Sequence, residues 1–135
     1  MLPNKKQETI YLAGGFRSGW QLKVIEMLPQ FDFLDPSAHK IQDPALYTKW
    51  DLDAIRKSDV ILAYMESSNP AGYALSLEIG FAHALGKEVI LVDQIEDAKI
   101  SRYFEMIRQC SNKIFDAMPE AIRYLQSRCH KKTQA

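Results

Sequence analysis

The sequence has little that points to a secreted, membrane-bound or nucleic-acid-binding protein. Only two cysteines occur in 135 residues, Cys110 and Cys129, and their spacing predicts neither a disulfide framework nor a zinc site. The longest strongly apolar run, 60–65, is far shorter than the ~20 residues that span a bilayer, and the polar segment 1–8 is unlike a secretory signal. Seventeen basic and seventeen acidic residues balance, which leaves no broad positive field for a nucleic-acid backbone. We therefore expect a cytoplasmic protein that has neither a membrane nor a nucleic-acid polymer as its partner.

What the chain does have is the composition of an ordinary globular domain. Hydrophobic residues make up 47% of it and charged residues 25%, a composition that favours neither the disordered nor the fibrous class. Its length is near the commonest size of one domain, and it shows no internal repeat and no linker. We expect a single domain over residues 1–135, with 1–7 and 128–135 frayed.

Apolar runs of strand length alternate with segments of helical period along the chain. The predicted strands are 9–13, 31–34, 60–64, 88–92 and 113–115. The predicted helices are 19–28, 49–57, 75–85, 101–110 and 119–127, with Gly86 as a helix C-cap and Pro119 in the first turn of the last helix. This alternation predicts an α/β fold with a doubly wound, five-stranded parallel sheet, in the flavodoxin-like or Rossmann-like order 2-1-3-4-5, with helices on both faces. A ligand would then bind at the carboxyl ends of the strands, between the first and the third.

The loop after the first strand is a candidate binding loop. Gly14 and Gly15 let backbone N–H groups approach a ligand closely at a helix N-terminus, where an anion or a sugar hydroxyl could bind. Arg17 and Ser18 add a forked cation and a hydroxyl, which suits a phosphate. The alternative is that a strand-to-helix turn needs glycine in any case.

Glu78 is the first candidate catalytic residue. A polar, turn-rich connection that contains Asn69 and Gly72 precedes the helix, and Glu78 lies about one turn inside it. The neighbours of Glu78 in the sequence are almost wholly apolar. We expect the helix to be buried on most sides, with Glu78 as a partly desolvated carboxylate kept ionised by the positive helix N-terminus, as a nucleophile requires. The alternative is a glutamate that points to solvent or caps the helix.

Asp51 is the second candidate. It shares a helix face with Ala54, Ile55 and Ser58, near the predicted start of that helix. It could simply interact with its own helix N-terminus. The sharper hypothesis is that Asp51 and Glu78 converge on one pocket, where one acts as nucleophile while the other orients a hydroxyl or handles a proton.

The remaining side chains of chemical interest give weaker signals. The histidines His39, His83 and His130 share no spacing with each other or with acidic residues, so we assign them no role and expect neither a metal nor a cofactor. Several aromatic residues lie near the two candidate loops, where some could stack on a planar base while most pack in the core. They are Tyr11, Phe16, Trp20, Tyr47 and Trp50.

Three segments together resemble the nucleoside 2-deoxyribosyltransferase family and its relatives, the 2′-deoxynucleoside 5′-phosphate N-hydrolases. They are residues 11–17, Asp51 followed eight positions later by Asp59, and residues 78–87, and the resemblance covers nearly the whole chain. It implies cleavage of the N-glycosidic bond of a deoxynucleoside or nucleotide by double displacement. Glu78 would attack the anomeric carbon, and a second base or water would then take the sugar.

The resemblance also implies roles for the other residues. Asp51 would bind sugar hydroxyls or transfer a proton, and Tyr11 with Gly14, Gly15, Phe16 and Arg17 would hold the base and sugar. In the phosphate-accepting relatives that loop also holds the 5′-phosphate, together with the loop before the catalytic helix. Here that second loop contains Asn69 and Gly72.

The family assembles as dimers or larger oligomers in which a neighbour completes the pocket, and Ser111 and Asn112 are candidate donors of this kind. Residues 69–78 lack the acidic residue and the Gly-x-Gly stretch that transferases commonly carry before the catalytic glutamate. Transfer and hydrolysis therefore both stay open, as do the base, ribose against deoxyribose, and the need for a 5′-phosphate. The alternative from another class is a non-catalytic nucleotide-binding or signalling module of the same fold, which would have little need for a desolvated Glu78.

Overall fold

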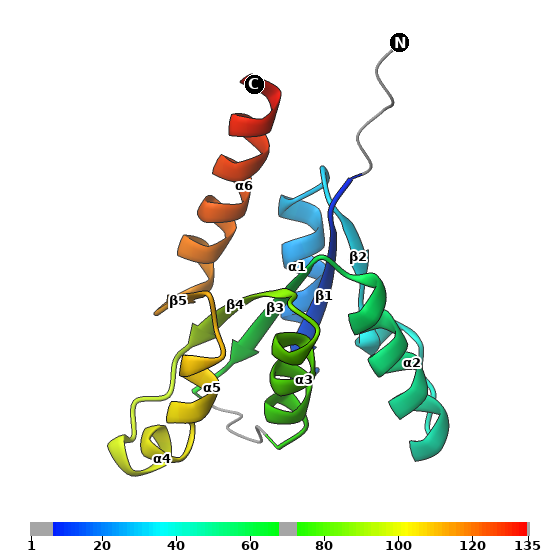
Figure 1. Cartoon of the computed structure of the whole chain (residues 1–135), viewed down its shortest axis with the longest axis vertical. Coiled ribbons are helices and arrows are strands. Elements are labelled where there is room, and N and C mark those ends of the chain that lie inside the picture. The colour runs from blue at the N-terminus through cyan, green and yellow to red at the C-terminus, as the bar shows by residue number, and fades with distance from the viewer. Residues whose placement is uncertain (1–6, 68–72, 135) are drawn as a thin grey trace.

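The computed structural model of the chain describes residues 7–67 and 73–134 (Figure 1). Five strands form one parallel sheet in the predicted order β2-β1-β3-β4-β5. They are β1 (Thr9–Gly14), β2 (Asp32–Leu34), β3 (Val60–Met65), β4 (Glu88–Asp93) and β5 (Lys113–Phe115). Each lies within one or two residues of its predicted position, because apolar runs of strand length mark the strands of a sheet that is covered on both faces.

The helices differ more from prediction than the strands do. They are α1 (Trp20–Met27), the 3₁₀ helix η1 (Pro36–Ala38), α2 (Pro44–Lys57), α3 (Tyr73–Ala84), α4 (Ala98–Tyr103), α5 (Glu105–Gln109) and α6 (Met118–Gln134). The predicted helix 101–110 is two short helices that meet at Phe104, and η1 was not predicted. Across residues 7–67 and 73–134, no helix is both long and apolar enough to cross a bilayer.

Helix α2 begins five residues before the predicted start. Asp43 caps it by accepting a hydrogen bond from the Leu46 backbone N–H at 3.0 Å, and Pro44 occupies the first turn. An Asp-Pro pair is a strong start signal, because the aspartate satisfies an unpaired N–H and the proline lacks one. The prediction that placed Asp51 near this helix start is therefore wrong, since Asp51 is the eighth residue of α2.

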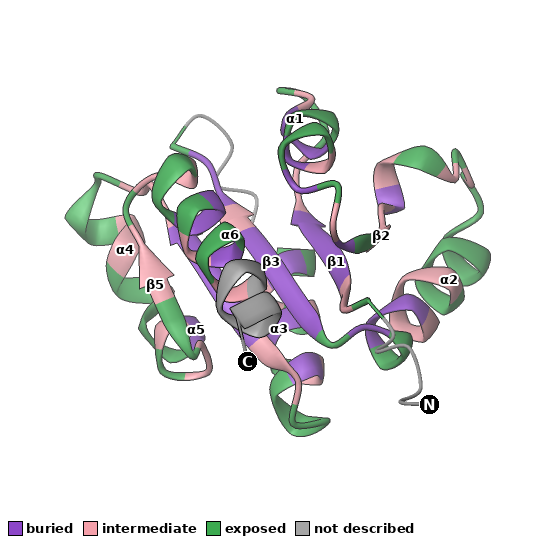
Figure 2. Ribbon diagram, turned by 90° about the horizontal axis from the view of Figure 1, so that it is seen from above, coloured by how far each residue is buried: buried purple, intermediate pink, exposed green. Residues whose placement is uncertain are grey.

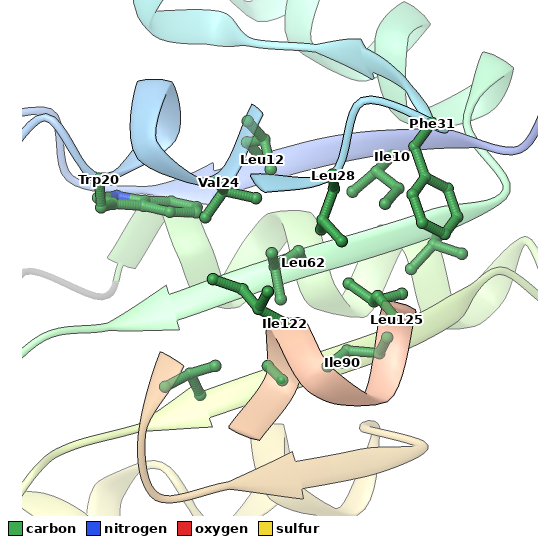
Figure 3. Packing of buried hydrophobic residues seen from close by; sticks show 13 residues of the cluster. Ile10, Leu12, Trp20, Val24, Leu28, Phe31, Leu62, Ile90, Ile122 and Leu125 are labelled. Atoms are coloured by element: carbon green, nitrogen blue, oxygen red, sulfur yellow. The ribbon is translucent and has the colours of Figure 1, made fainter. Parts of the chain in front are cut away.

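Two hydrophobic clusters cover the two faces of the sheet. Along β1, Ile10 and Leu12 face α1 and α6, whereas Tyr11 and Ala13 face α2, α3 and α5. Figure 2 shows α1 and α6 on one side of the sheet, and Figure 3 shows the packing on that side. Strands β3 and β4 are buried on both faces, and each fully buried aliphatic side chain contributes about 1.5–3 kcal/mol of hydrophobic free energy.

Helix α6 continues to Gln134, beyond its predicted end at residue 127, and the predicted fraying of 128–135 stays a prediction. The Arg128 guanidinium lies against the amino ends of β1 and β4. It pairs with Glu8 at 3.4 Å, binds Glu88 closely, and donates to the Tyr124 hydroxyl at 3.2 Å. These contacts bind the helix to the sheet near its predicted end. Of residues 1–7, which were also predicted to fray, 1–6 lie outside the described residues.

Helix α3 is buried on one face only, which corrects the expectation that most of its surface is covered. Leu75, Ile79 and Ala82 pack on the sheet, while Tyr73 is 91% exposed and Leu77 60% exposed. The helix ends as predicted, because Gly86 has a φ of +72° and its N–H and that of Lys87 bond to the last turn, as in a Schellman motif.

The strand order places a crevice at the carboxyl ends of β1 and β3. The connection after β1 leads to α1 on one face, and that after β3 leads to α3 on the other, so the two chain segments diverge there. Gly14, the last residue of β1, pairs with Tyr64 of β3 and has a φ of +150°. A Cβ at Gly14 would lie 2.8 Å from the Tyr64 carbonyl oxygen, so only glycine fits this close approach.

Candidate active site

A cavity of about 390 Å³ occupies this crevice. Its volume is in the range of small-molecule sites. The described residues that line it come from β1 and its loop, the segment after β2, α2, the end of β3, and α3. They are Tyr11, Gly14, Gly15, Phe16, Pro36, His39, Ile41, Tyr47, Asp51, Tyr64, Met65, Ala74, Leu75 and Glu78.

Glu78 and Tyr11 form a hydrogen-bonded pair at this cavity. Tyr11 is wholly buried on the α3 side of β1, and its hydroxyl donates a hydrogen bond to Glu78 Oε2. Glu78 therefore points into the cavity, and the alternative of a solvent-facing or helix-capping glutamate is wrong.

The surroundings of Glu78 favour its neutral form. Burial raises the pKa of Glu78 to about 7, the hydrogen bond from Tyr11 opposes that shift, and the charge of Asp51 adds to it. Burial, together with the Glu78 charge, also raises the pKa of Tyr11 far above its usual value, so its hydroxyl stays protonated as a donor. The expected stabilisation by the helix N-terminus is not what sets the charge of Glu78, because burial dominates.

Asp51 lines the same cavity from the middle of α2. Its Oδ1 lies 3.1 Å from His39 Nε2. Burial raises the pKa of Asp51, and the hydrogen bond from His39 opposes that rise. The alternative in which Asp51 interacts with its own helix start is wrong, because α2 starts two turns earlier. The structure thus brings Asp51 and Glu78 to one pocket, as the sharper hypothesis predicted.

The β1–α1 loop is held by hydrogen bonds from two side chains of α1 to its backbone. The Gly15 carbonyl accepts hydrogen bonds from Trp20 Nε1 at 2.9 Å and from Gln21 Nε2 at 3.0 Å, and both of those side chains are buried. Gly14, Gly15 and Phe16 contribute to the cavity wall. Arg17 is exposed and is not among the described lining residues, so its contact with a phosphate stays a prediction.

Two further predicted residues lie at the opposite, amino edge of the sheet. The Asn112 side-chain oxygen accepts a hydrogen bond from the Val89 N–H at 2.8 Å, so within the chain Asn112 joins the starts of β4 and β5. Asp59 accepts from the Thr9 N–H at 2.9 Å and joins the starts of β1 and β3. The contribution of Asn112 to a neighbour's pocket stays a prediction, and Asn69 and Gly72 lie outside the described residues.

Sequence reasoning missed His39 and Tyr64. His39 follows the end of β2 by five residues, so the topology alone would have placed it at the carboxyl edge, although its separation from Asp51 matches no local spacing. Tyr64 lies next to last in β3, and its hydroxyl donates to Gln94 Oε1 at 2.8 Å. Of the aromatic residues noted from sequence, Trp20 and Trp50 lie behind the cavity and pack edge-on against Tyr64 and His39.

The charges at the cavity are negative. Its described lining contains two carboxylates, Asp51 and Glu78, and neither lysine nor arginine. In the part of the chain that the structure describes, no group of histidine, cysteine, aspartate and glutamate could hold a metal ion. The polar side chains of the described lining are the two carboxylates, the hydroxyls of Tyr11, Tyr47 and Tyr64, and the His39 imidazole.

A family model described as "nucleoside 2-deoxyribosyltransferase like" matches residues 7–95, which include every described residue of the cavity lining. A search of curated proteins gives no match. Among solved structures, a 2-desoxiribosyltransferase from Leishmania mexicana has a TM-score of 0.68 at 21% identity, over 87% of this chain and 95% of that one. A 2-deoxyribosyltransferase from Bacillus psychrosaccharolyticus also has a TM-score of 0.68, at 19% identity, over 84% of this chain and 90% of that one. A CMP N-glycosidase from Clostridium botulinum is 25% identical, over 88% of this chain and 98% of that one, with a TM-score of 0.59.

Proposed function

Because the chain belongs to the nucleoside 2-deoxyribosyltransferase like family, we propose that it cleaves the N-glycosidic bond of a nucleoside or nucleotide through a glycosyl-enzyme on Glu78. The observation that carries this proposal is the convergence of two carboxylates on one cavity, one of them bonded to the buried Tyr11 hydroxyl. A binding module of the same fold has no need to hold such a group where burial raises its pKa to about 7.

In the first step the ionised Glu78 attacks the anomeric carbon of the sugar. The Tyr11 hydroxyl engages Oε2, so we assign the attack to Oε1. A bond forms between Oε1 and the anomeric carbon as the bond to the base nitrogen breaks, and the base leaves with that electron pair. Burial makes the carboxylate a better nucleophile here than in water, because it is poorly solvated.

In the second step an incoming base nitrogen or a water oxygen attacks the same carbon. The ester bond to Glu78 breaks, the carboxylate regains its electron pair, and the proton that the incoming group loses balances the proton that the departed base takes up. Transfer of 2-deoxyribose to a base and hydrolysis differ only in this acceptor. Two displacements at one carbon retain its configuration, as in other glycosyl-enzyme mechanisms.

Asp51 is the group that we assign to the sugar hydroxyls or to proton transfer. Burial raises its pKa, which brings it closer to the range in which a carboxyl can give and take a proton. Its position on α2, across the cavity from α3, lets it act on the substrate while Glu78 acts on the anomeric carbon.

A nucleoside is the first candidate substrate. The described lining combines two carboxylates with the aromatic rings of Phe16, Tyr47 and Tyr64, which suits an uncharged sugar and a planar base. A 5′-monophosphate is the second candidate. It is favoured by the similarity to a CMP N-glycosidase, and Lys40 lies in a hollow that shares Phe16 and His39 with the cavity.

The proposal is tested by incubating the protein with a panel of nucleosides and 5′-monophosphates, each with and without a second free base. Chromatography should detect free base in at least one reaction. Exchange of the base would identify a transferase, and release without exchange would identify a hydrolase. A panel that gives neither exchange nor release would contradict the proposed function.

We further propose that the chain assembles as a homodimer or a higher homo-oligomer. Helix α3, which carries Glu78, presents an exposed outer face made of Tyr73, Leu77, Gly80 and Ala84. These positions are spaced so that they share one side of a helix, and large exposed apolar side chains on such a side favour contact with another chain. Tyr103 and Met106 add exposed apolar surface on the neighbouring α4 and α5.

A further inference from the structure

His39 is held on three sides, although the sequence analysis assigned it no role. Its Nδ1 accepts a hydrogen bond from the Ile41 backbone N–H at 3.0 Å, and its Nε2 lies 3.1 Å from Asp51 Oδ1. The Trp50 ring packs against the imidazole edge-on, with ring centroids 4.7 Å apart. Only 12% of the His39 side chain is exposed. A side chain fixed on so many sides has little rotational freedom of its own.

These contacts define the tautomer of His39. A backbone N–H can only donate, so Nδ1 must offer its lone pair to Ile41. In the neutral imidazole the proton is then on Nε2, which donates to Asp51 Oδ1. A proton on Nδ1 would face the Ile41 N–H, and that hydrogen bond would be lost.

This arrangement has a consequence for Asp51. The carboxylate lies in the middle of α2, where no helix end can hold it, and His39 binds one of its two oxygens. The hydrogen bond restricts rotation of the carboxylate and favours its ionised form against the effect of burial. The second oxygen is the one that can meet a ligand in the cavity.

We propose that His39 is the positioning residue for Asp51: its Nε2–H holds Oδ1 so that Oδ2 is presented as an acceptor to a hydroxyl of the bound sugar. This inference rests on the proposed function, because it assigns the sugar as the partner of Asp51. His39 acts through Asp51 and does not touch the reacting atoms. The ligand class that it selects is a sugar with a free hydroxyl on the α2 side of the cavity.

Two substitutions separate positioning from simple filling of space. In His39→Gln, the side-chain amide nitrogen reaches about the place of Nε2 and can still donate to Asp51. His39→Leu keeps an apolar contact with Trp50 and has no donor. We expect kcat/KM to fall by about 10- to 100-fold in His39→Leu, the cost of a misplaced catalytic group, and to stay within about fivefold of wild type in His39→Gln. A His39→Leu protein within about twofold of wild type, or a His39→Gln protein as impaired as His39→Leu, would overturn the proposal.

A second measurement does not depend on catalytic activity. Long-range ¹H–¹⁵N correlation spectra of the wild-type protein should show His39 as the neutral Nε2–H tautomer, assigned by its absence from His39→Gln. Asp51→Asn should move the His39 Nε2 resonance. An Nδ1–H tautomer, or a resonance that Asp51→Asn leaves in place, would refute the contact. If the wild-type protein cleaves no substrate in the panel, the proposed function fails, while these spectra still decide whether His39 holds Asp51.

Discussion

The hydrogen-bonded pair of Glu78 and Tyr11 sets the pH range in which Glu78 can act as a nucleophile. A buried carboxyl prefers its neutral form, whereas a nucleophile must be charged. Burial and the charge of Asp51 raise the pKa of Glu78, and the Tyr11 hydroxyl lowers it by donating to the charged form. The net result of these effects is a pKa of about 7. Tyr11 can do this because it is itself fully buried and its own pKa is raised, so that it remains a donor.

Removal of the Tyr11 hydroxyl should change the pH dependence of catalysis. Only the ionised form of Glu78 attacks, so kcat/KM of the wild-type enzyme should rise with pH through a midpoint near 7. Tyr11→Phe deletes the hydrogen bond that favours the charged form, so the midpoint should move to higher pH. At pH 6, well below the midpoint, the rate should fall by about tenfold for each pKa unit of that move.

The control for this prediction is Tyr64→Phe. Tyr64 also lines the cavity, but its hydroxyl donates to Gln94 and not to Glu78, so the midpoint should stay in place. The measurement is kcat/KM from pH 5 to pH 9 for the three proteins. A midpoint in Tyr11→Phe that is unchanged or lower would contradict this account of the pair.

At the residue scale the sequence could predict some of the site and not the rest. Glu78 was predictable because a carboxylate among apolar neighbours needs a reason, and Asp51 because it shares a helix face with buried residues. The role of His39 was not predictable, because its contact with Asp51 depends on how the segment after β2 folds back over α2. The raised pKa of Glu78 also depends on burial that a sequence pattern does not measure.

At the scale of elements, the end of β1 is the most constrained part of the site. Gly14 combines a φ of +150° with a close approach to the Tyr64 carbonyl, and a Cβ there would also lie 3.1 Å from the Trp20 ring. Both neighbours help to form the cavity or to support its wall. The geometry of this turn therefore links the backbone of β1 to the shape of the binding site.

Gly14→Ala should destabilise the protein by about 2–5 kcal/mol, from backbone strain together with the steric clash. Gly19→Ala is a matched control in the same loop. Gly19 also has a positive φ, +69°, but a Cβ there meets nothing within 4 Å, so only the strain of about 1–2 kcal/mol should remain. Urea unfolding monitored by circular dichroism would measure both. Equal destabilisation of the two variants would contradict the clash at Gly14.

The elements differ in how far the sequence could define them. Strands were placed well, because a strand buried on both faces needs a run such as 60–65 with scarcely a polar residue. Helix limits were placed less well, because they depend on caps and on tertiary contacts. The Asp43 cap started α2 early, a turn at Phe104 divided α4 from α5, and Arg128 held α6 to the sheet.

At the level of the whole molecule, the outer face of α3 is an exposed apolar surface beside the site. Tyr73 and Leu77 are exposed at the start of the helix that carries Glu78, and Ala74 between them lines the cavity. A second copy bound there would cover apolar surface and close one side of the cavity. Helix α3 would then carry both Glu78 and the contact between the two copies.

We expect light scattering to show a dimer or a larger oligomer at micromolar concentration. Leu77→Glu should shift that species toward the monomer, because a charge would be buried in the contact without a partner. Leu22→Glu is the control, since Leu22 is similarly exposed, at 65% against 60%, but lies on α1 on the other face of the sheet. A wild-type monomer, or equal behaviour of the two variants, would argue against assembly through α3.

If Glu78 forms a covalent bond to the sugar, the glycosyl-enzyme can be trapped and identified. A nucleoside with fluorine at C2 of its sugar slows both displacements, so the glycosyl-enzyme should accumulate and be visible by mass spectrometry of the intact protein. We predict a mass increase of one fluorinated glycosyl group, with peptide mapping that places it on Glu78, and loss of both the label and base release in Glu78→Gln. A label on another residue, or unlabelled Glu78→Gln that still releases base at the wild-type rate, would contradict the account.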